Sequence, residues 1–255
     1  MDGPSQEEEQ LLFACQDGRL EEINQLLQNP KINLNCFDFY SRTPFFSACG
    51  NGHIKAVNLF LNDARVNIGK RDRSGRTPFY AACQNGHIEI VKLLFNHERV
   101  DINQADYSGW TPFAISCQVG QIQILKLFLN DERVDINQAS NKGRTPLDIA
   151  HSNWHLKVVQ LILISEKLLE KHVKSAYANT QKNFCSKYLF NHQDLKPRKA
   201  ATKKLLEEYL EDKEKVKFKI KKELGILDQD SAKIYSLMVL VSDNYLKTAQ
   251  EENFL

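Results

Sequence analysis

Short apolar segments with helical spacing alternate with polar turns along the first two thirds of the chain. The segment beginning at Thr77 and Pro78 is typical of a helix start, since threonine suits the N-cap and proline lacks only an N–H that the first turn does not use. Gly86 is expected to end this helix. A second helix then places its apolar residues on one face: Ile88, Val91, Leu94 and Phe95. The pattern predicts two short antiparallel helices.

A polar connection follows each predicted helix pair. Asn96, with Asn62 and Asn130 at the same register, is expected to end the second helix in the left-handed conformation. Asp106 and Gly109 then suit a tight hairpin turn. The predicted unit is therefore a hairpin, a helix, a turn and a second helix.

This unit recurs with a period of 34 residues. The Thr-Pro pair marks it at Thr43-Pro44, Thr77-Pro78, Thr111-Pro112 and Thr145-Pro146. Three further sets keep the same period: Cys15, Cys49, Cys83 and Cys117; Gly18, Gly52, Gly86 and Gly120; and Leu34, Ile68, Ile102 and Ile136. The repeat therefore extends upstream of the first Thr-Pro pair.

Together, the segments Gly-x-Thr-Pro-Phe, Ala-Cys-x-x-Gly-His-Ile and Val-Asp-Ile-Asn resemble the ankyrin repeat. The resemblance covers residues 8–171 and implies an all-α solenoid of paired antiparallel helices with β-hairpin or turn connections. We divide it into five units: residues 8–37, 38–72, 73–106, 107–140 and 141–171. The first unit lacks Thr-Pro and follows an acidic leader, residues 1–7, as a solvent-facing cap should.

Two departures from the family pattern are visible. The histidine that usually stands two positions after the proline is replaced by Phe46, Tyr80, Ala114 and Asp148. Aromatic packing is expected in place of that histidine's hydrogen bonds. The common ankyrin period is also one residue shorter, and we expect the extra residue between Asn62, Asn96 or Asn130 and the following Val66, Val100 or Val134.

Composition constrains the partner only weakly. The 34 basic and 32 acidic side chains leave a net charge of +2, which favours neither nucleic acid nor a membrane surface. The first ten residues do not resemble a secretory signal, and no apolar run approaches the roughly 20 residues that span a membrane. We expect a cytoplasmic protein whose six cysteines are free thiols, since no Cys-x-x-Cys pair occurs.

Candidates for chemistry are few. The periodic cysteines are interpreted as buried packing residues, and the neighbouring register holds His53 and His87 but then Gln121, which a metal site would not tolerate. The sequence contains no nucleophile elbow, phosphate loop or zinc-protease motif. Asp148 and His151 are interpreted as a surface pair. We predict no enzyme activity, no cofactor and no metal.

The ankyrin resemblance implies that a protein partner binds at the hairpin tips and on the exposed side of the first helices. The predicted contact residues are Phe39, Tyr40, Arg42, Arg73, Arg76, Tyr80, Tyr107, Trp110, Gln118, Lys142 and Arg144. Further candidates are Phe46, Ser74, Gln84, Asn85, Ser108, Val119 and Asn141. Tyrosine, tryptophan and arginine dominate interface hot spots, which favours this surface. The alternative for Phe46 and Tyr80 is that both rings pack inward.

The period stops after residue 171, and residues 172–255 are predicted to form a separate helical region. Pro197 indicates a basic linker near residues 193–204, because proline disfavours helix just before it. A helix is expected from Thr202 to Gly225. Within it, residues 215–221 alternate between lysine and apolar residues, which is typical of a strand, but helix is favoured. A last helix is expected from Asp230 or Ser231 to Lys247.

Two further resemblances lie in this region. The segments Lys222-Glu223-Leu224-Gly225, Ile234-Tyr235-Ser236-Leu237 and Asp243-Asn244-Tyr245-Leu246-Lys247 resemble a helical tail appended to ankyrin arrays in some single-celled eukaryotes. The segments Lys196-Pro197-Arg198-Lys199 and Lys203-Lys204 resemble a nuclear localisation signal, with a solvated linker and helix face as the alternative.

These observations lead to one expectation and one alternative. We expect a monomeric, non-enzymatic scaffold or adaptor that binds a protein partner through the array. The alternative is a nuclear protein whose lysine-rich C-terminal region contacts nucleic acid, in which case binding would weaken steeply with salt. Residues 172–255 hold too few convergent polar groups to indicate a hidden enzyme.

Overall fold

The computed structural model describes residues 4–165, 167–168, 173–174, 176 and 195–223 of the chain. Over these ranges the backbone forms helices and turns without any strand. The chain divides into two compact units, Met1–Thr202 and Lys203–Leu255. The predicted last helix from Asp230 or Ser231 to Lys247 lies outside the described residues.

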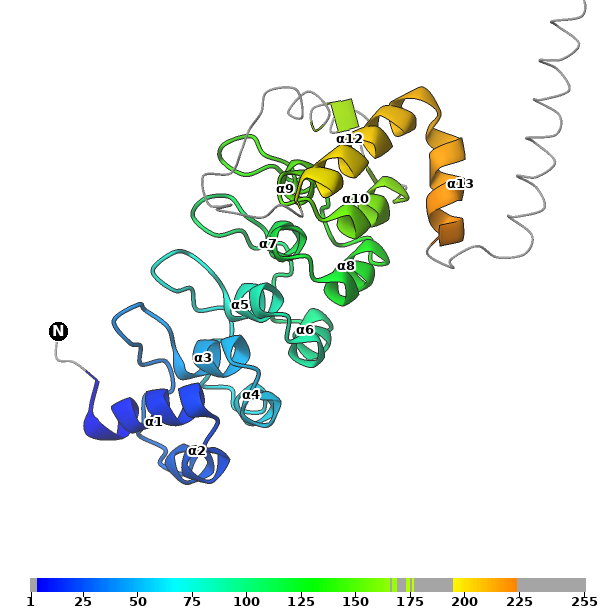
Figure 1. The fold of residues 1–255 in the computed structure, drawn as a ribbon. Helices are drawn as coiled ribbons and strands as arrows, with labels where there is room; N and C mark the ends of the chain where they lie inside the picture. Colours follow the sequence, from blue (N-terminus) through cyan, green and yellow to red (C-terminus); the bar gives the residue numbers. More distant parts are fainter. Residues whose placement is uncertain (1–3, 166, 169–172, 175, 177–194, 224–255) are drawn as a thin grey trace, which may run out of the picture. The chain divides into compact units, whose positions relative to one another are not determined.

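Five helix pairs, one for each repeat unit, lie in the compact part Met1–Thr202 (Figure 1). The pairs are α1 (Gln6–Asp17) with α2 (Leu20–Leu27), α3 (Pro44–Gly50) with α4 (Ile54–Leu61), α5 (Pro78–Asn85) with α6 (Ile88–Phe95), α7 (Pro112–Val119) with α8 (Ile122–Leu129), and α9 (Pro146–Ser152) with α10 (Leu156–Leu163). The first helices of the pairs stack in one row and the second helices in another, each against its neighbour. The predicted all-α solenoid is confirmed.

Each of the four Thr-Pro pairs starts a helix as predicted. The threonine hydroxyl accepts a hydrogen bond from the N–H three residues on, at 3.1 Å from Phe46, Tyr80, Ala114 and Asp148. The proline occupies the first turn, where no intrahelical partner for an N–H exists. A local sequence signal therefore fixes where each first helix begins.

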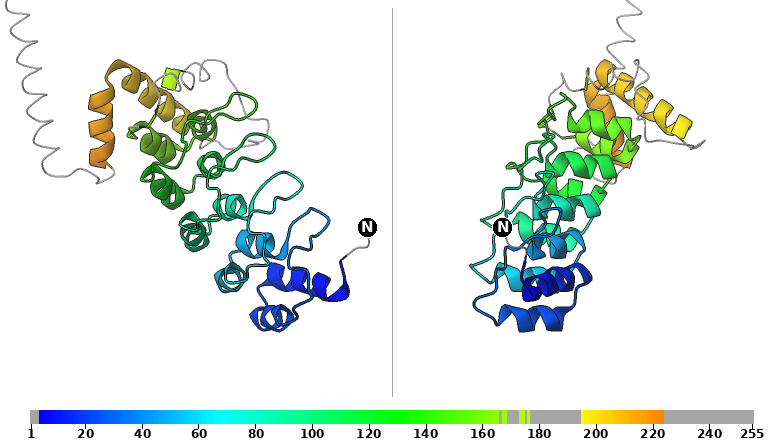
Figure 2. Two further views of the ribbon diagram at one scale, coloured as in Figure 1. Left: turned by 180° about the vertical axis from the view of Figure 1, so that it is seen from behind. Right: turned by 90° about the vertical axis from the view of Figure 1, so that its left-hand side faces the viewer.

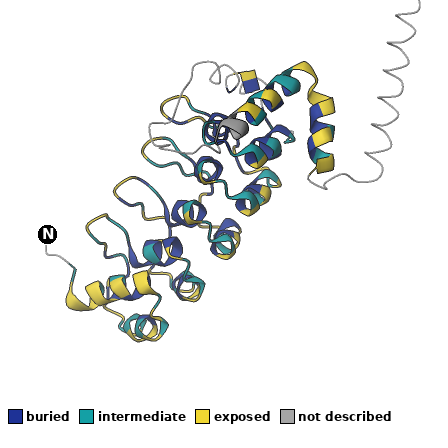
Figure 3. Ribbon diagram, viewed as in Figure 1, coloured by how far each residue is buried: buried dark blue, intermediate teal, exposed yellow. Residues whose placement is uncertain are grey.

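Phenylalanine rings fill the space between the two rows. The ring of Phe128 lies 6.0 Å from Phe79, 5.4 Å from Phe95 and 6.1 Å from Phe113, centroid to centroid. All four rings are buried, and Figure 3 shows that the buried residues face the interior between the helices. Because these rings come from neighbouring units, each unit depends on the next for its core.

A turn glycine brings consecutive units into close contact. Gly52 has φ of 84°, and a Cβ atom there would lie 2.7 Å from the imidazole of His87 in the next unit. The His87 Nε2 lies 2.9 Å from the carbonyl oxygen of Gly50. Gly18, Gly86 and Gly120 hold the same position relative to His53, Gln121 and His155. Histidine and glutamine thus occupy the same place against the turn glycine.

The fifth unit has a tryptophan, Trp154, where the earlier units have the turn glycine. Trp154 stands 34 residues after Gly120 and keeps a positive φ of 57°. Its ring is mostly buried and meets His151 edge to face, with 4.9 Å between centroids. A large side chain thus occupies the position at which the preceding units receive a histidine or glutamine side chain from the next unit.

The asparagines at the ends of the second helices do not adopt the predicted conformation. Asn62, Asn96 and Asn130 have φ of −82°, −94° and −85°, in the right-handed region. At Asn62 and Asn96 an arginine from the next unit binds a carbonyl near the helix end in place of a left-handed cap, and beyond Asn130 Lys167 donates to the Asp131 oxygen. Arg99 donates to the Leu61 oxygen at 3.3 Å, and Arg133 donates to the Phe95 oxygen at 3.4 Å.

Two helices end the described part of the chain, α12 (Leu195–Glu211) and α13 (Lys213–Glu223). The predicted linker is therefore wrong from Leu195 onward, because Pro197 falls in the first turn of α12, where proline is tolerated. The single helix predicted from Thr202 to Gly225 is also interrupted. Asp212 accepts a hydrogen bond from the Lys215 N–H at 2.9 Å and so caps a new helix. The alternating residues 215–221 are helical, as expected.

Candidate functional site

The hairpins that precede the first helices share one construction. Asp106 Oδ1 accepts hydrogen bonds from the N–H groups of Ser108 and Trp110, both at 2.9 Å. Gly109 takes a φ of 79° and closes the turn onto the Asp106 carbonyl at 3.0 Å. Asp38 and Asp72 build the same turn in their hairpins. The predicted tight turn at Asp106 and Gly109 is confirmed.

Backbone hydrogen bonds join the tips of successive hairpins. The Arg73 N–H donates to the Tyr40 oxygen at 2.8 Å, and the Tyr107 N–H donates to the Ser74 oxygen at 3.1 Å. The Asn141 N–H donates to the Ser108 oxygen at 3.0 Å. The four hairpin loops lie side by side in both views of Figure 2. The backbone at each of these tips is therefore tied to the backbone of the neighbouring tip.

Exposed aromatic rings at these tips are each covered by a cation. Phe39 is 74% exposed and Tyr107 is 63% exposed. The Arg73 guanidinium lies 4.5 Å above the Phe39 ring, and the Arg71 guanidinium lies 4.8 Å above the Tyr107 ring. Tyr40, also exposed, carries Arg42 of its own hairpin at 4.8 Å. These side chains, which we call the tip row, combine large apolar area with positive charge at the surface.

A groove lies behind the tips of the third and fourth units. It has a volume of about 450 Å³ and is open to solvent. Its walls come from two hairpins and from the helices α5 and α7: Ser74, Arg76, Tyr80, Gln84, Asp106, Tyr107, Ser108, Trp110, Ile115 and Gln118. Five of the predicted contact residues thus meet in one place, which we call the hairpin groove: Arg76, Tyr80, Tyr107, Trp110 and Gln118.

Tyr80 and Phe46 pack inward, so the alternative stated for these two rings is confirmed and the exposed position is wrong. Tyr80 is 3% exposed and Phe46 is 5% exposed. Burying a large ring next to the neighbouring unit releases more free energy than leaving it in water. The Tyr80 hydroxyl still reaches the groove, where it lies 3.5 Å from Asp106 Oδ2. Burial raises the pKa of Tyr80 well above its usual value, and the Asp106 charge adds to this, so the phenol keeps its proton.

The remaining predicted contact residues lie outside the groove. Phe39, Tyr40, Arg42 and Arg73 belong to the tips of the second and third units, and Lys142 and Arg144 to the hairpin of the fifth. Lys142 is exposed and Arg144 is half-buried. Among the further candidates, Val119 is exposed, whereas Asn85 donates to the Gly50 oxygen at 2.6 Å and so holds two units together.

A family model describing ankyrin repeats, three copies, matches residues 11–106 and 98–175. The chain is an ankyrin-repeat protein. No curated protein sequence matches it. Ankyrin repeats generally mediate protein–protein interaction, and the family is typically non-enzymatic. No described helix of this ankyrin-repeat protein is long and apolar enough to cross a bilayer.

Sequence reasoning misses two parts of this ankyrin surface. The sequence indicates Asp106 only as a turn residue, yet its second carboxylate oxygen faces the hairpin groove. Nothing in the repeat pattern points to Arg71, which lies over Tyr107. A signal for Asp106 is present, since Asp38 and Asp72 are each followed four residues later by arginine and Asp106 is followed by Trp110.

The periodic cysteines lie buried in the first helices of the ankyrin units. Cys15, Cys49, Cys83 and Cys117 have no exposed surface, and burial raises the pKa of each thiol well above its usual value. Burial also raises the pKa of Cys36, to about 12. The described residues contain no group of three or more potential metal ligands. The thiols therefore serve packing and are poor nucleophiles.

Asp148 and His151 do not form the predicted surface pair, because both are buried. Asp148 Oδ2 accepts hydrogen bonds from the Thr145 N–H at 2.9 Å and from the Thr145 hydroxyl at 2.7 Å. This reciprocal cap closes the start of α9. His151 packs against Trp154. Both residues hold the fifth ankyrin unit together.

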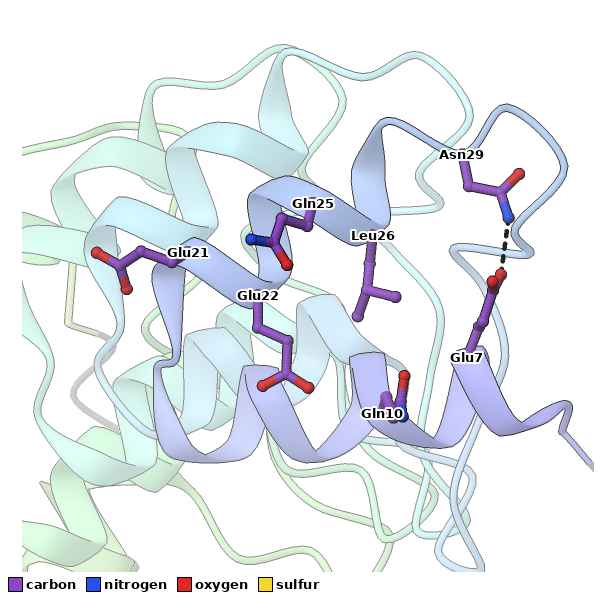
Figure 4. Close-up of a pocket in the computed structure, with 7 residues that line it drawn as sticks. All are labelled: Glu7, Gln10, Glu21, Glu22, Gln25, Leu26 and Asn29. Atoms are coloured by element: carbon purple, nitrogen blue, oxygen red, sulfur yellow. Dashed lines mark hydrogen bonds between the residues drawn. The ribbon is translucent and has the colours of Figure 1, made fainter.

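A second hollow, of about 520 Å³, lies on the first unit between α1 and α2 (Figure 4). Its lining is mainly polar and acidic: Glu7, Gln10, Glu21, Glu22, Gln25, Leu26 and Asn29. Figure 4 shows Asn29 bonded to Glu7, at 2.7 Å between the amide nitrogen and the carboxylate. Exposed residues also follow α1 in Figure 3. This polar face fits a solvent-facing first unit.

Proposed function

We propose that this ankyrin-repeat protein is a non-enzymatic scaffold or adaptor that binds a protein partner through the tip row and the hairpin groove. The predicted cytoplasmic location and monomeric state belong to the same proposal. The exposed aromatic rings at the hairpin tips support it most directly. Phe39, Tyr40 and Tyr107 hold apolar area in water that folding alone does not require.

The arrangement of the tips favours recognition over packing. The backbone that carries these rings is fixed, because hydrogen bonds between hairpins join Arg73 to Tyr40 and Tyr107 to Ser74. Rigid aromatic and arginine side chains lose little conformational entropy when a partner binds, and they dominate interface hot spots. Hydrogen bonds from Arg76 to Asp72 and Gln84, and from the Tyr80 hydroxyl to Asp106, hold the groove walls in place.

The proposal is tested with a double substitution at the tips, Phe39→Ser with Tyr40→Ser. Both rings are solvated, so the free energy of unfolding should change by less than about 1 kcal/mol. Proteins cross-linked to or co-purified with the full chain should be lost. The matched control is Phe13→Ser on α1, which removes a ring that is 58% exposed and belongs neither to the tip row nor to the hairpin groove. Retention of the same partners by the tip variant would rule out the tips as the binding surface.

A second comparison separates binding from folding within the groove. Trp110 is half-buried, so Trp110→Ala should weaken binding of the captured partner by about 2 kcal/mol or more and should lower stability by clearly less than a core truncation does. Leu94→Ala removes a side chain that is 1% exposed and should lower stability by about 2–5 kcal/mol. If Trp110→Ala unfolds the chain as readily as Leu94→Ala, Trp110 is a packing residue instead.

The alternative function, contact with nucleic acid through the lysine-rich C-terminal region, makes an opposite prediction. Binding would then fall steeply with salt, since each phosphate contact releases counterions. It would also survive the tip substitutions. Measuring partner binding by the full chain between about 50 and 200 mM salt distinguishes the two functions.

A further inference from the structure

The hairpins of the second and third units each contain an internal ion pair. Arg42 Nε donates to Asp38 Oδ2 at 2.8 Å, and Arg76 Nε donates to Asp72 Oδ2 at 2.8 Å. A second nitrogen of each guanidinium, Nη2, lies 2.6 Å and 2.7 Å from the same oxygens. In both hairpins Oδ1 caps the turn and Oδ2 holds an arginine from four positions on.

The hairpin of the fourth unit keeps the acid and lacks the arginine. Asp106 caps its turn through Oδ1 as the other aspartates do. The residue four positions on is Trp110, which offers only its backbone N–H to the carboxylate. Within the described part of the chain, Oδ2 of Asp106 accepts one hydrogen bond, the long contact of 3.5 Å from the Tyr80 hydroxyl.

The nearby arginines are engaged elsewhere. Arg76 binds Asp72 and also donates to Gln84 Oε1 at 3.3 Å. Arg71 donates to the backbone oxygens of Gly75 and Ala105. Among the residues that the structure describes, no basic side chain forms an ion pair with the Asp106 carboxylate, with nitrogen and oxygen within 4.0 Å. The Asp72 and Arg76 charges cancel, and the Arg71 charge lies over the Tyr107 ring, so Asp106 is a groove carboxylate that none of these arginines pairs with.

The groove around this carboxylate suits a flat cation. Trp110 and Tyr107 supply aromatic surface, and Gln84, Gln118 and Ser74 supply polar groups along the same walls. A guanidinium combines parallel N–H donors with a face that stacks on aromatic rings. The tip row shows the same chain stacking guanidinium on Phe39 and Tyr107.

We propose that the hairpin groove binds an arginine side chain of the partner, with Asp106 Oδ2 accepting from its guanidinium in place of the arginine that the fourth hairpin lacks. This inference rests on the proposed function and specifies the chemistry of the partner. The partner's arginine completes across the interface an ion pair that the second and third hairpins form internally.

The test uses blocked tripeptides, Gly-Arg-Gly, Gly-Lys-Gly and Gly-citrulline-Gly, titrated into the isotopically labelled full chain and followed by backbone amide NMR. Citrulline has the shape of arginine without its charge. The arginine peptide should shift the amides around Trp110 and Asp106 at millimolar concentration, with at least about tenfold weaker binding by citrulline. Lysine should fall between them, because it cannot form parallel hydrogen bonds.

Three variants locate the site. Asp106→Asn keeps the Oδ1 cap of the turn and removes the charge, so it should weaken the arginine peptide at least about tenfold. Trp110→Arg restores the residue found in the second and third hairpins and should abolish binding by filling the site. Asp101→Asn removes an exposed turn carboxylate outside the groove and controls for overall charge, with no expected effect.

Equal binding of the arginine and citrulline peptides, full binding by Asp106→Asn, or binding that survives Trp110→Arg would each overturn the inference. So would the absence of any shift up to about 10 mM arginine peptide. The proposed function is independent of these results, since it fails only if the tip variants keep their partners. If the tip variants lose their partners but the arginine peptide does not bind, the adaptor function is supported and this inference is refuted.

Discussion

At the scale of single residues, the turn between the two helices of a unit sets how closely the next unit can approach. Gly52 adopts a left-handed conformation, and the space beside it is filled by His87. Two requirements therefore coincide at this position, a positive φ and the absence of a side chain. Gly143, in a hairpin, has φ of 71°, and a Cβ atom there would meet nothing within 4 Å. At Gly143, therefore, only the positive φ requires glycine.

These two glycines separate backbone strain from steric overlap. Gly143→Ala should cost about 1–2 kcal/mol of stability, the penalty of a left-handed alanine. Gly52→Ala should cost about 2–4 kcal/mol, because its Cβ also displaces the His87 ring from the Gly50 carbonyl. Urea unfolding of both variants gives the comparison. Equal losses for the two would show that the His87 ring moves aside freely.

At the scale of elements, the loop after each second helix connects its own unit to the preceding one. Arg133 binds Asp131 in the same loop at 2.8 Å and also donates to the Phe95 carbonyl of the preceding unit. Hydrogen bonds from the Arg133 side chain and backbone lower the pKa of Asp131 to about 2. Arg65 and Asp63 repeat the arrangement, and the hydrogen bond from the Arg65 side chain likewise lowers the pKa of Asp63.

The lowered pKa predicts how acid affects this loop. An unfolded aspartate titrates at a pKa of about 3.9, above the folded value, so the stabilisation by Asp131 is present above about pH 4 and is lost as the pH falls to about 2. Asp131→Asn should therefore be less stable than the unmodified chain at about pH 6, with the difference shrinking below about pH 4. Urea midpoints across this range test the prediction, with Asp101→Asn as the control. A difference that persists unchanged at about pH 2 would contradict it.

Elements with local signals could be predicted from the sequence, and elements that depend on distant partners could not. The threonine caps and the aspartate turns are each complete within five residues, and they occur where expected. The prediction for the asparagine ends is wrong because an arginine one unit away takes the place of a left-handed cap. The predicted start of α12 is wrong because proline is neutral in a first turn and disruptive later, and the sequence alone does not distinguish the two positions.

At the scale of the whole molecule, the surface was predictable in outline and not in detail. The period placed Arg76, Tyr107 and Trp110 on neighbouring hairpins, and they do meet in one groove. The inward turn of Tyr80 depends on the space left by the adjacent unit, which no single repeat encodes. The importance of Asp106 emerges only when its hairpin is compared with those of Asp38 and Asp72.

The array should fold without the rest of the chain, because each unit buries its faces against its neighbours. Val173 and Ala176 are buried, so we choose residues 1–176 for this test. This fragment should give a helical circular dichroism spectrum and a cooperative urea transition, within a few kcal/mol of the full chain. A fragment without a cooperative transition would show that later residues are integral to the array.

Trp154 bears on how many units can follow one another. In the four earlier turns a glycine admits the side chain of the next unit, whereas at this position a sixth unit would collide with the indole. At the opposite end the first unit exposes a polar, glutamate-rich face. Head-to-tail stacking of copies requires two complementary ends, and such contacts grow into fibres unless the rotation between copies closes a ring. The tryptophan that replaces one glycine therefore leaves the fifth unit without the contact on which such head-to-tail growth would depend.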